Sequence, residues 1–490
     1  MNTTVSIIVI SSLVALTTVN WAYFKILQIA KEKNIVDNPD ARKLQKRPIP
    51  VMGGVAVFIG VVAGVLCGMA LQGVLGLNVN GSVVAVICAM MVMLYVGSMD
   101  DMLGLTPRSR LIIEVFTILV LIYATGVCVD TFHGLWGIDR FSWYIGVPLT
   151  VFGGVGIINS INMIDGVNGL SSGLCIACSV MFGCVFLKTN DTANAVLAFT
   201  MAASLLPFLM HNVFGNRSKM FIGDAGTMVM GVLLTWFTMS VLHADSAISY
   251  YGSTTKVNLI ALSLAIMSVP VADTLRVMSM RMMKKKSPFQ PDKTHLHHIF
   301  INVGISHSVT SLTEIFIDIL IVGIWALSVI CGASMEMQLY IVIALCIIFV
   351  GGTYVFIHYH VKHHTPFMHR LAHFSVATHL GHKHWWMFLQ NWLDSPEKEK
   401  KEVSEAAQIR ADHLARRFEH VDPTNFKEVD RKKVYEFMKG KAEVFVDDIR
   451  KRSGADKMRV YAIIFEGEQE GYINVITRDS WGAPVIVSLE

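Results

Sequence analysis

The sequence predicts an all-α polytopic membrane protein with about eleven transmembrane helices, followed by a small C-terminal α+β cytoplasmic domain. Of its 490 residues, 53% are hydrophobic and only 16% are charged. Long apolar stretches recur up to residue 358, whereas about half of the charged residues follow Asp394. We therefore divide the chain into a membrane core at 1–358, a His- and Trp-rich interfacial segment at 359–394 and an accessory domain at 395–490.

The apolar stretches justify the helices in order, because a helix that crosses the hydrocarbon core needs about 20 predominantly apolar residues. We expect spans at 4–29, 51–74, 82–99, 110–128, 143–162, 170–188, 193–212, 225–243, 257–280, 314–333 and 337–358. The first stretch is too long for a signal peptide and lacks a basic start and a small-residue cleavage site. We expect it to remain as a helix.

Lysine and arginine in the short loops predict the orientation, because cytoplasmic loops carry the excess of positive charge. One side holds Lys31, Lys33, Arg42, Lys43, Lys46, Arg47, Arg108, Arg110, Arg217, Lys219, Arg281, Lys284, Lys285, Lys286 and Lys293. The opposite loops hold only Arg140, Lys188 and Lys256. We therefore expect the N-terminus outside and the basic loops and tail in the cytoplasm. The net charge of +4 is divided between this basic face and a mixed-charge tail, and we expect no nucleic-acid partner.

Carboxylates stand where apolar stretches meet their loops on the predicted cytoplasmic side. They are Asp100 and Asp101 after the run at 91–96, Asp165, and Asp224, and a further loop contains His295, His297 and His298. Acidic groups beside hydrocarbon are costly and are usually retained for ion binding or chemistry. Because charge bias and carboxylate position select the same face, the sequence predicts one site there.

These residue types suit phosphoryl transfer, which needs cations to neutralise phosphate charge and a group that positions the nucleophile. Mg²⁺ commonly takes one or two carboxylates together with substrate phosphates and water. Cationic donors would be Arg47, Arg108, Arg110, Arg217, Lys219 and Lys293, and amides would be Asn159, Asn162 and Asn212. The three histidines suit a phosphate clamp or proton handling.

Structural explanations compete with each of these assignments. Asp100 could pair with Arg108 or Arg110, and Asp273 could pair with Arg276 or stabilise a helix. The convergence of four acids from different loops favours a site. The eight cysteines lie within or at the ends of apolar stretches, and the C-x-x-C at 175–178 lacks a second pair, so packing is favoured over zinc. The sequence has neither a P-loop nor a strand-borne G-x-G-x-x-G.

Seven blocks of the chain resemble the polyprenyl-phosphate N-acetylhexosamine-1-phosphate transferases, an integral membrane family. They are VDNPDARK (36–43), PIPVMGG (48–54), GSMDD (97–101), NSINMIDGVNGL (159–170), FIGDAGT (221–227), PVADTLRV (270–277) and SPFQPDKTHLHHIF (287–300). The blocks run in order and fall on five predicted cytoplasmic loops. The last block and the basic stretch at 215–219 are most similar to the bacterial undecaprenyl-phosphate N-acetylglucosamine-1-phosphate transferases.

The resemblance implies that N-acetylhexosamine-1-phosphate, most simply N-acetylglucosamine-1-phosphate, passes from a UDP-sugar to undecaprenyl phosphate with Mg²⁺ (or Mn²⁺), releasing UMP. It implies a bacterial inner membrane location and a role at the start of lipid-linked cell-surface glycan synthesis. Another UDP-N-acetylhexosamine or UDP-MurNAc-pentapeptide is the alternative donor. A homodimer and a downstream glycosyltransferase docked on the C-terminal domain are further partner hypotheses.

The resemblance also implies residue roles. Asp224, with Asp100, would bind Mg²⁺, and Asp100 and Asp101 would orient or deprotonate the lipid phosphate. Asn159, Asn162 and Asp165 would line the nucleotide pocket, Phe221 would approach the uracil, Asn212 would contact nucleotide or metal, and His295, His297 and His298 would hold the sugar-phosphate end. Two positions depart from the family pattern: Asn168 replaces the second acid of the D-G-x-D-G block, and Arg108 replaces the usual lysine after the aspartate pair.

The tail is expected to be accessory. Nine of the 18 histidines lie in 358–384, before a Trp-rich run, and we prefer an amphipathic interfacial segment to a metal store. Beyond it we expect helices at 396–420 and 430–452 and strands at 459–465, 472–477 and 484–489, with Gly467 and Gly471 marking a hairpin.

Two other functions compete with the transferase: a lipid or ion-coupled transporter and a non-catalytic scaffold. A transporter is disfavoured because its polar sites lie near the bilayer midplane.

Overall fold

The chain forms two compact units, Met1–Asp394 and Ser395–Glu490, in a computed structural model. The structure describes residues 2–37, 48–77, 80–246, 248, 256–287, 294–363, 365–394, 425–439, 441, 443–457, 459–469, 472–478 and 483–489. The first unit contains the candidate site and the second contains a small sheet, so each is considered by itself.

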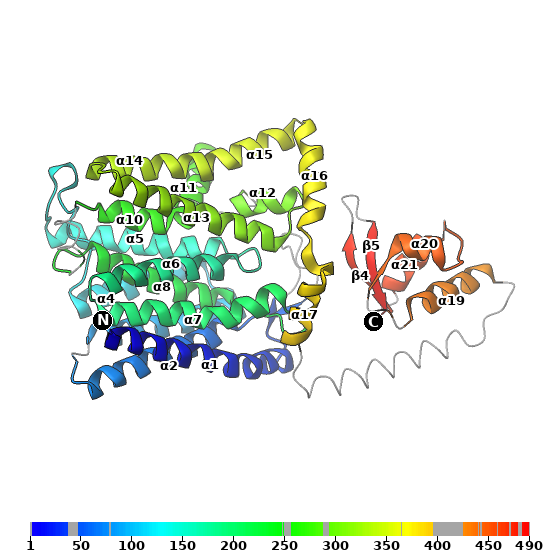
Figure 1. The fold of residues 1–490 in the computed structure, drawn as a ribbon, viewed down its shortest axis with the longest axis horizontal. Coiled ribbons are helices and arrows are strands. Elements are labelled where there is room, and N and C mark those ends of the chain that lie inside the picture. Colours follow the sequence, from blue (N-terminus) through cyan, green and yellow to red (C-terminus); the bar gives the residue numbers. More distant parts are fainter. Residues whose placement is uncertain are drawn as a thin grey trace. The chain divides into compact units, whose positions relative to one another are not determined.

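The first unit is a bundle of helices that run largely side by side (Figure 1). The helices of the bundle are α1 (Asn2–Glu32), α2 (Gly53–Val74), α3 (Ser82–Leu103), α4 (Pro107–Thr125), α5 (Trp143–Met163), α6 (Leu170–Lys188), α7 (Thr192–Phe214), α8 (Gly223–Leu242), α10 (Leu259–Ile266), α11 (Ser268–Met283), α13 (His307–Ile330), α14 (Met335–Cys346) and α15 (Thr353–Lys362). The remaining elements of this unit are η1 (Leu135–Gly137), α12 (Leu296–Asn302), the π-helical η2 (Ile347–Gly352), α16 (Pro366–Thr378), η3 (Leu380–His382) and α17 (His384–Leu393).

Several helices begin at a side-chain cap that satisfies an otherwise unpaired backbone N–H group. Thr106 caps α4, where Pro107 occupies the first position, and Asp191 caps α7. Asn258, Ser306 and Ser334 cap α10, α13 and α14. These polar residues interrupt the apolar stretches and fix where each helix starts.

The predicted count of eleven spans is not confirmed. In the part of the chain that the structure describes, nine helices have the length and apolar composition to cross a membrane, and α10 with α11 forms a further pair bent by 81°. The expected span at 257–280 is therefore broken at Met267. The expected span at 110–128 corresponds to α4, which has the length but carries Arg108, Arg110 and Glu114 in its first turns.

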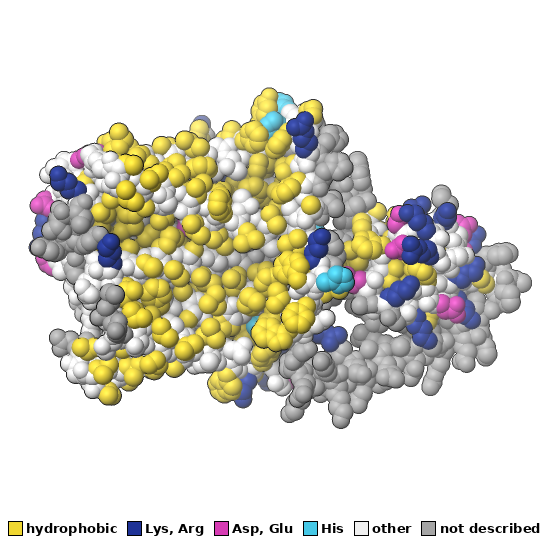
Figure 2. All heavy atoms as spheres, in the orientation of Figure 1, with side chains coloured by type: hydrophobic (Ala, Val, Ile, Leu, Met, Phe, Trp, Pro, Cys, Tyr) yellow, Lys and Arg dark blue, Asp and Glu magenta, His cyan; other side chains and the backbone are white. Residues whose placement is uncertain are grey.

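The face of the bundle seen in Figure 2 is apolar along its length, whereas charged side chains gather toward its ends. The exposed large apolar side chains of the bundle include Ile112 and Phe116 of α4 and Leu312 and Phe316 of α13. Exposed leucine, isoleucine and phenylalanine in such numbers are expected where lipid rather than water is the solvent. The surface agrees with a polytopic membrane protein.

Helix α8 is the centre of the bundle and is buried along nearly its whole length. It packs against α3 on one side and α5 on the other. Glycines permit these close approaches: a Cβ on Gly97 of α3 would lie 2.4 Å from the Ala225 backbone, and one on Gly231 would lie 2.7 Å from Ile158. The last turns of α3 and α5 therefore meet the first turn of α8.

The interfacial segment predicted at 359–394 contains the end of α15, α16, η3 and α17. Helix α16 runs across one end of the bundle, and α17 lies beside that end of α7, whereas the N-terminus lies at the other end (Figure 1). The aromatic rings of Trp385 and Trp386 pack against Phe214 at centroid distances of 6.3 and 4.6 Å. Trp385, Phe388 and Trp392 keep exposed apolar surface, as the interfacial interpretation expects.

The second unit has α19 (Phe426–Met438), α20 (Val446–Arg452) and α21 (Val460–Gln469) with an antiparallel sheet in the order β3–β5–β4. The strands are β3 (Val444–Phe445), β4 (Ile473–Arg478) and β5 (Pro484–Leu489), with Val444 opposite Val487 and Ile473 opposite Leu489. These helices and strands enclose an apolar cluster that includes Val434, Ile449, Ile464 and Val487.

Two predictions for the second unit were wrong. The expected strand at 459–465 is the helix α21, which also contains Gly467, so the expected hairpin at that glycine does not form. The expected helix at 430–452 is divided by β3. The strands expected at 472–477 and 484–489 are confirmed as β4 and β5. The helix expected at 396–420 and Gly471 lie outside the described residues.

Candidate functional site

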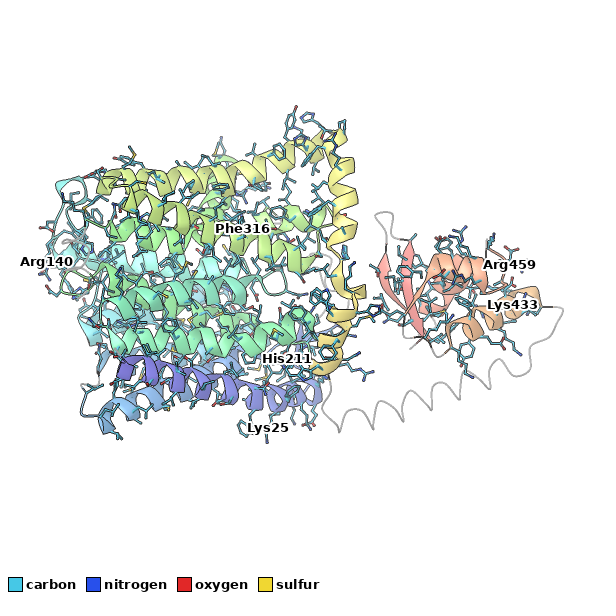
Figure 3. The ribbon with its side chains drawn as sticks, in the orientation of Figure 1. Lys25, Arg140, His211, Phe316, Lys433 and Arg459 are labelled. Atoms are coloured by element: carbon cyan, nitrogen blue, oxygen red, sulfur yellow. The ribbon has the colours of Figure 1, made fainter. Side chains whose placement is uncertain are left out.

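Three helix ends bring the predicted polar residues together. Asp100 and Asp101 lie in the last turn of α3, Asn159 and Asn162 in the last turns of α5, and Asp224 in the first turn of α8. The loop from α7 to α8 completes this end of the bundle. It is the end where α17 lies, opposite Arg140, as the views of the labelled His211 and Arg140 show (Figure 3).

Asp101 caps α8. Its two carboxylate oxygens accept hydrogen bonds from the backbone N–H groups of Asp224 and Ala225, at 2.8 and 3.2 Å. Gly223 makes this approach feasible, because it has a φ of +71° and a Cβ there would lie 2.4 Å from Asp101 Oδ2. The carboxylate of Asp101 therefore fixes the first turn of α8, which carries Asp224.

Arg110 joins two of the predicted metal ligands. Its Nη1 lies 3.1 Å from Asp100 Oδ2 and 3.9 Å from Asp224 Oδ2. Of the two arginines considered as partners of Asp100, Arg110 makes the pair, whereas Arg108 is exposed at the start of α4. Asp100 also accepts a 2.7 Å hydrogen bond from the backbone N–H of Leu105, which holds its carboxylate toward this cluster.

Glu114 extends the cluster and was missed in the sequence analysis. It is buried on α4, and it lies 3.7 Å from Arg110 and accepts a 2.6 Å hydrogen bond from Asn159 Nδ2. Its position one turn after Arg110, where the apolar stretch of α4 begins, was the available signal, because an acid there needs a partner. Glu114 links the amide of α5 to the guanidinium that faces the two aspartates.

The predicted amides divide into two groups. Asn162 donates to Asp224 Oδ1 at 2.5 Å and to Thr227 at 2.9 Å, so it fixes the side chain of Asp224. Asn212 accepts from the Gly169 N–H at 2.8 Å and donates to the Met220 carbonyl at 3.0 Å. Asn212 is buried and joins the loop that contains Gly169 to the segment that contains Met220.

The loop at 165–169 is open to solvent at Asp165, whose carboxylate accepts a 2.6 Å hydrogen bond from Ser171. Asn168 has its backbone N–H 3.3 Å from His307 Nδ1, and its carbonyl accepts from Ser311. The residue that departs from the family pattern is thus anchored through its backbone to α13. Among the described residues, the contacts that hold Asn168 to α13 are made by its backbone.

Phe221 connects the first cytoplasmic segment to α8. Its N–H donates to Pro50 and its carbonyl accepts from Gly53, so Val51 and Phe221 form a parallel bridge. Pro50 belongs to β2 (Ile49–Pro50), which pairs with β1 (Val36–Asp37). The blocks at 48–54 and 221–227 are therefore neighbours, with the half-buried ring of Phe221 at their junction. Arg47, in the same segment, lies outside the described residues.

The histidine loop is fastened to α11 by Asp273. This buried carboxylate lies 2.8 Å from His295 Nδ1, accepts from the Leu296 N–H and pairs with Arg276 at 2.6 Å. The alternative of an Asp273–Arg276 pair is confirmed. His295 is thus held by an acid and its neighbours on α12 are placed with it, although Lys293 lies outside the described residues.

His297 brings this loop against the loop that carries Asp165. A Cβ on Gly166 would lie 2.8 Å from His297 Nε2, and the rings of His297 and His298 are 4.4 Å apart. His297 is buried, and its Nδ1 has no hydrogen-bond partner in the described structure. Burial, together with His298 and His295, lowers the pKa of His297 well below its ordinary value, so its imidazole is neutral at pH 7.

The basic stretch at 215–219 supplies cations of different character. Arg217 is exposed, whereas Lys219 is half-buried and desolvation lowers the pKa of its ammonium group to about 8. Lys219 is therefore mainly charged at pH 7, although it titrates more readily than an ordinary lysine. A charged donor that is partly stripped of water suits a phosphate better than an exposed one does.

Two carboxylates of this site could bind a divalent cation whose remaining ligands come from the substrate and water. Asp100 and Asp224 already converge on a single cationic nitrogen, Arg110 Nη1, so one positive group reaches both. Among the described residues no group of three or more His, Cys, Asp or Glu is placed to hold a metal. The donor set therefore suits Mg²⁺, which binds through one or two carboxylates plus phosphate oxygens and water, rather than an all-protein metal cage.

Comparison with known proteins gives one family. Residues 83–242 match the family described as glycosyl transferase family 4. A probable undecaprenyl-phosphate N-acetylglucosaminyl 1-phosphate transferase of Bacillus subtilis is 31% identical over 69% of this chain and 89% of its own length. The undecaprenyl-phosphate alpha-N-acetylglucosaminyl 1-phosphate transferases of Escherichia coli (strain K12) and Salmonella typhi are 27% and 28% identical, over 57% and 58% of this chain and 72% and 73% of their own lengths.

Proposed function

Because the chain belongs to glycosyl transferase family 4 and is a multi-pass membrane transferase, we propose that it moves N-acetylglucosamine-1-phosphate from UDP-N-acetylglucosamine to undecaprenyl phosphate. The observation that carries this proposal is the meeting of Asp100, Arg110 and Asp224 at one end of an apolar bundle. There a lipid phosphate from the bilayer and a nucleotide from water can share one polar site. The names of the relatives support undecaprenyl phosphate as the acceptor and N-acetylglucosamine 1-phosphate as the transferred group, and the UDP-linked donor is part of the proposal.

In the proposed reaction a phosphate oxygen of the lipid attacks the phosphorus that bears the sugar. The bond from that phosphorus to the oxygen it shares with the uridylate phosphate breaks, and UMP leaves. Arg110 would orient the phosphates and screen their repulsion, which is most of what phosphoryl transfer asks of a protein. Asp100 is the better placed member of the aspartate pair to act at the lipid phosphate, because Asp101 is engaged at the start of α8.

Mg²⁺ would be held by Asp224 and Asp100 with the diphosphate of the donor, and when bound it would neutralise phosphate charge. Asn162 would keep the Asp224 carboxylate in place through its 2.5 Å hydrogen bond. Lys219 and the loop at 165–169 would receive the nucleotide, and His295, His297 and His298 would hold the sugar-phosphate end. The proposed location is a bacterial cytoplasmic membrane, with the N-terminus outside and the site and C-terminal unit in the cytoplasm.

The proposal is tested with purified protein in detergent, labelled UDP-N-acetylglucosamine, undecaprenyl phosphate and Mg²⁺. We expect UMP release and transfer of label to the lipid phase, both abolished by EDTA. UDP-N-acetylgalactosamine and UDP-MurNAc-pentapeptide in place of the donor would identify the sugar. Movement of a lipid or an ion without UMP formation would favour the transporter, and neither activity would favour the scaffold.

A further inference from the structure

A carboxylate at the end of α17 holds the loop between α7 and α8. Asp394 accepts hydrogen bonds from the backbone N–H groups of Asn216, Arg217 and Ser218, at 3.1, 3.2 and 2.9 Å, and from Ser218 Oγ at 2.7 Å. Three successive N–H groups pointing at one anion form a nest, which is a strong backbone site for negative charge. The loop's own N–H donors are therefore occupied by the chain and not left for phosphate.

The same loop is fixed from its other side by α1 and α7. Tyr23 donates to the Ser218 carbonyl at 2.8 Å, and Lys31 donates to the Arg217 carbonyl at 3.0 Å. His211 Nδ1 lies 3.0 Å from Ser218 Oγ. Asp394 thus completes a set of contacts by which α1, α7 and the end of α17 all hold this loop.

This loop leads directly into the candidate site. Lys219 follows it, the Met220 carbonyl accepts from Asn212, and Phe221 and Asp224 come next along the chain. A shift of the loop would move Lys219 and Phe221 relative to Asp224, which is held separately by Asn162 and Asp101. Donor binding would be affected more than the carboxylates that act on phosphate.

We propose that Asp394 is a positioning residue for the donor site, acting through the loop at 215–219. This rests on the proposed function. It also refines the expectation that the tail is accessory: Asp394, the last residue of the first unit, is required, whereas the unit at 395–490 is not.

The test compares Asp394→Ala with a control at the start of α7, the helix that leads into the loop held by Asp394. Asp191 caps that start by accepting two hydrogen bonds from Asn194, at 3.1 and 2.7 Å, so Asp191→Ala also removes a carboxylate that accepts backbone hydrogen bonds, but far from the site. We expect Asp394→Ala to raise KM for the UDP-sugar on the order of tenfold with a smaller change in kcat, as misplacement of a binding group does. Asp191→Ala should leave KM unchanged, and Asp394→Glu should recover part of the loss.

Hydrogen–deuterium exchange of the 215–222 segment gives a readout that needs no activity. Exchange should increase in Asp394→Ala and stay as in the wild type in Asp191→Ala. Faster exchange with an unchanged KM, or equal KM changes in both variants, would overturn the positioning role. An inactive wild type whose exchange still responds to Asp394→Ala would instead refute the proposed function.

Truncation separates Asp394 from the accessory unit. A chain ending after Pro396 keeps Asp394, and a chain ending after Leu393 lacks it. We expect the longer chain to keep the wild-type KM and the shorter chain to behave like Asp394→Ala. Equal KM values for the two truncations would contradict the proposal.

Discussion

The carboxylate of Asp101 accepts a 2.8 Å hydrogen bond from the backbone N–H of Asp224, so one acid of the site fixes the helix that presents another. The adjacent Asp100 instead faces Arg110 at 3.1 Å. From the sequence, we expected Asp100 and Asp101 to act together on the lipid phosphate. The structure gives its two members different surroundings, and their variants should differ accordingly.

Asp100→Asn and Asp101→Asn should both lower turnover by about 10²-fold or more, with little loss of the UDP affinity measured without Mg²⁺. Asparagine caps helices about as well as aspartate does, so the cap at the start of α8 is tested with Asp101→Ala, whose cost of about 1–2 kcal/mol thermal unfolding in detergent can detect against Asp101→Asn. Steady-state kinetics and UDP binding complete the comparison. If either variant kept wild-type turnover but lost UDP binding, the assigned roles would have to be exchanged.

Asp224→Ala should abolish transfer and weaken Mg²⁺-dependent binding of the UDP-sugar, because the diphosphate would lose its bridging ion. Binding of the donor measured with and without Mg²⁺ should show a large difference in the wild type and almost none in the variant. Thr227→Ala is the control, since Thr227 also accepts from Asn162 but contributes no charge. Substantial activity of Asp224→Ala at ordinary Mg²⁺ would refute the metal assignment.

The helices could be predicted from the sequence because lipid demands long apolar stretches, but a break inside one was hidden. Pro270 lies in the first turn of α11, where its missing N–H is tolerated, and Ser268 precedes it. The break is completed by Asp318 of α13, which accepts from Ser268 at 2.8 Å and Val269 at 3.1 Å. That contact joins distant parts of the chain, so only Pro270 could have indicated the bend.

The error at α21 has a simpler origin. Val460, Ile463, Ile464 and Gly467 are its buried residues, and their spacing of three and four is that of a helix. Reading the same segment as an alternating strand assigned the wrong period. In the candidate site, Asn162 contacts Asp224 as the sequence motifs at one face of the bundle predicted. Glu114 and Asp394 were missed because they act through contacts with residues that are distant in the sequence, which no local pattern encodes.

Gly166→Ala should reduce kcat/KM by roughly tenfold, because the added Cβ would lie 2.8 Å from His297 Nε2 and force the two loops apart. Gly156→Ala is the matched control: it lies on α5 with nothing within 4 Å of an added Cβ. That control should keep its activity and gain up to about 1 kcal/mol of stability, as glycine-to-alanine changes in helices do. Equal activity of the two variants would show that the histidine loop does not need its contact with Gly166.

The buried His297 predicts a stability that falls on acidification. Its pKa in the folded protein lies well below its ordinary value, whereas in the unfolded chain it is about 6.5. Between these values the unfolded chain binds the proton and the folded protein does not, so stability is lost as the pH decreases below about 6.5. His297→Gln should therefore lose less stability than the wild type between pH 7.5 and pH 5.5. Thermal unfolding at both values measures this difference, and His379→Gln, at an exposed position on the same side of the protein, should retain the wild-type decrease. An identical decrease in His297→Gln and the wild type would show that this imidazole takes up a proton without penalty in the folded state.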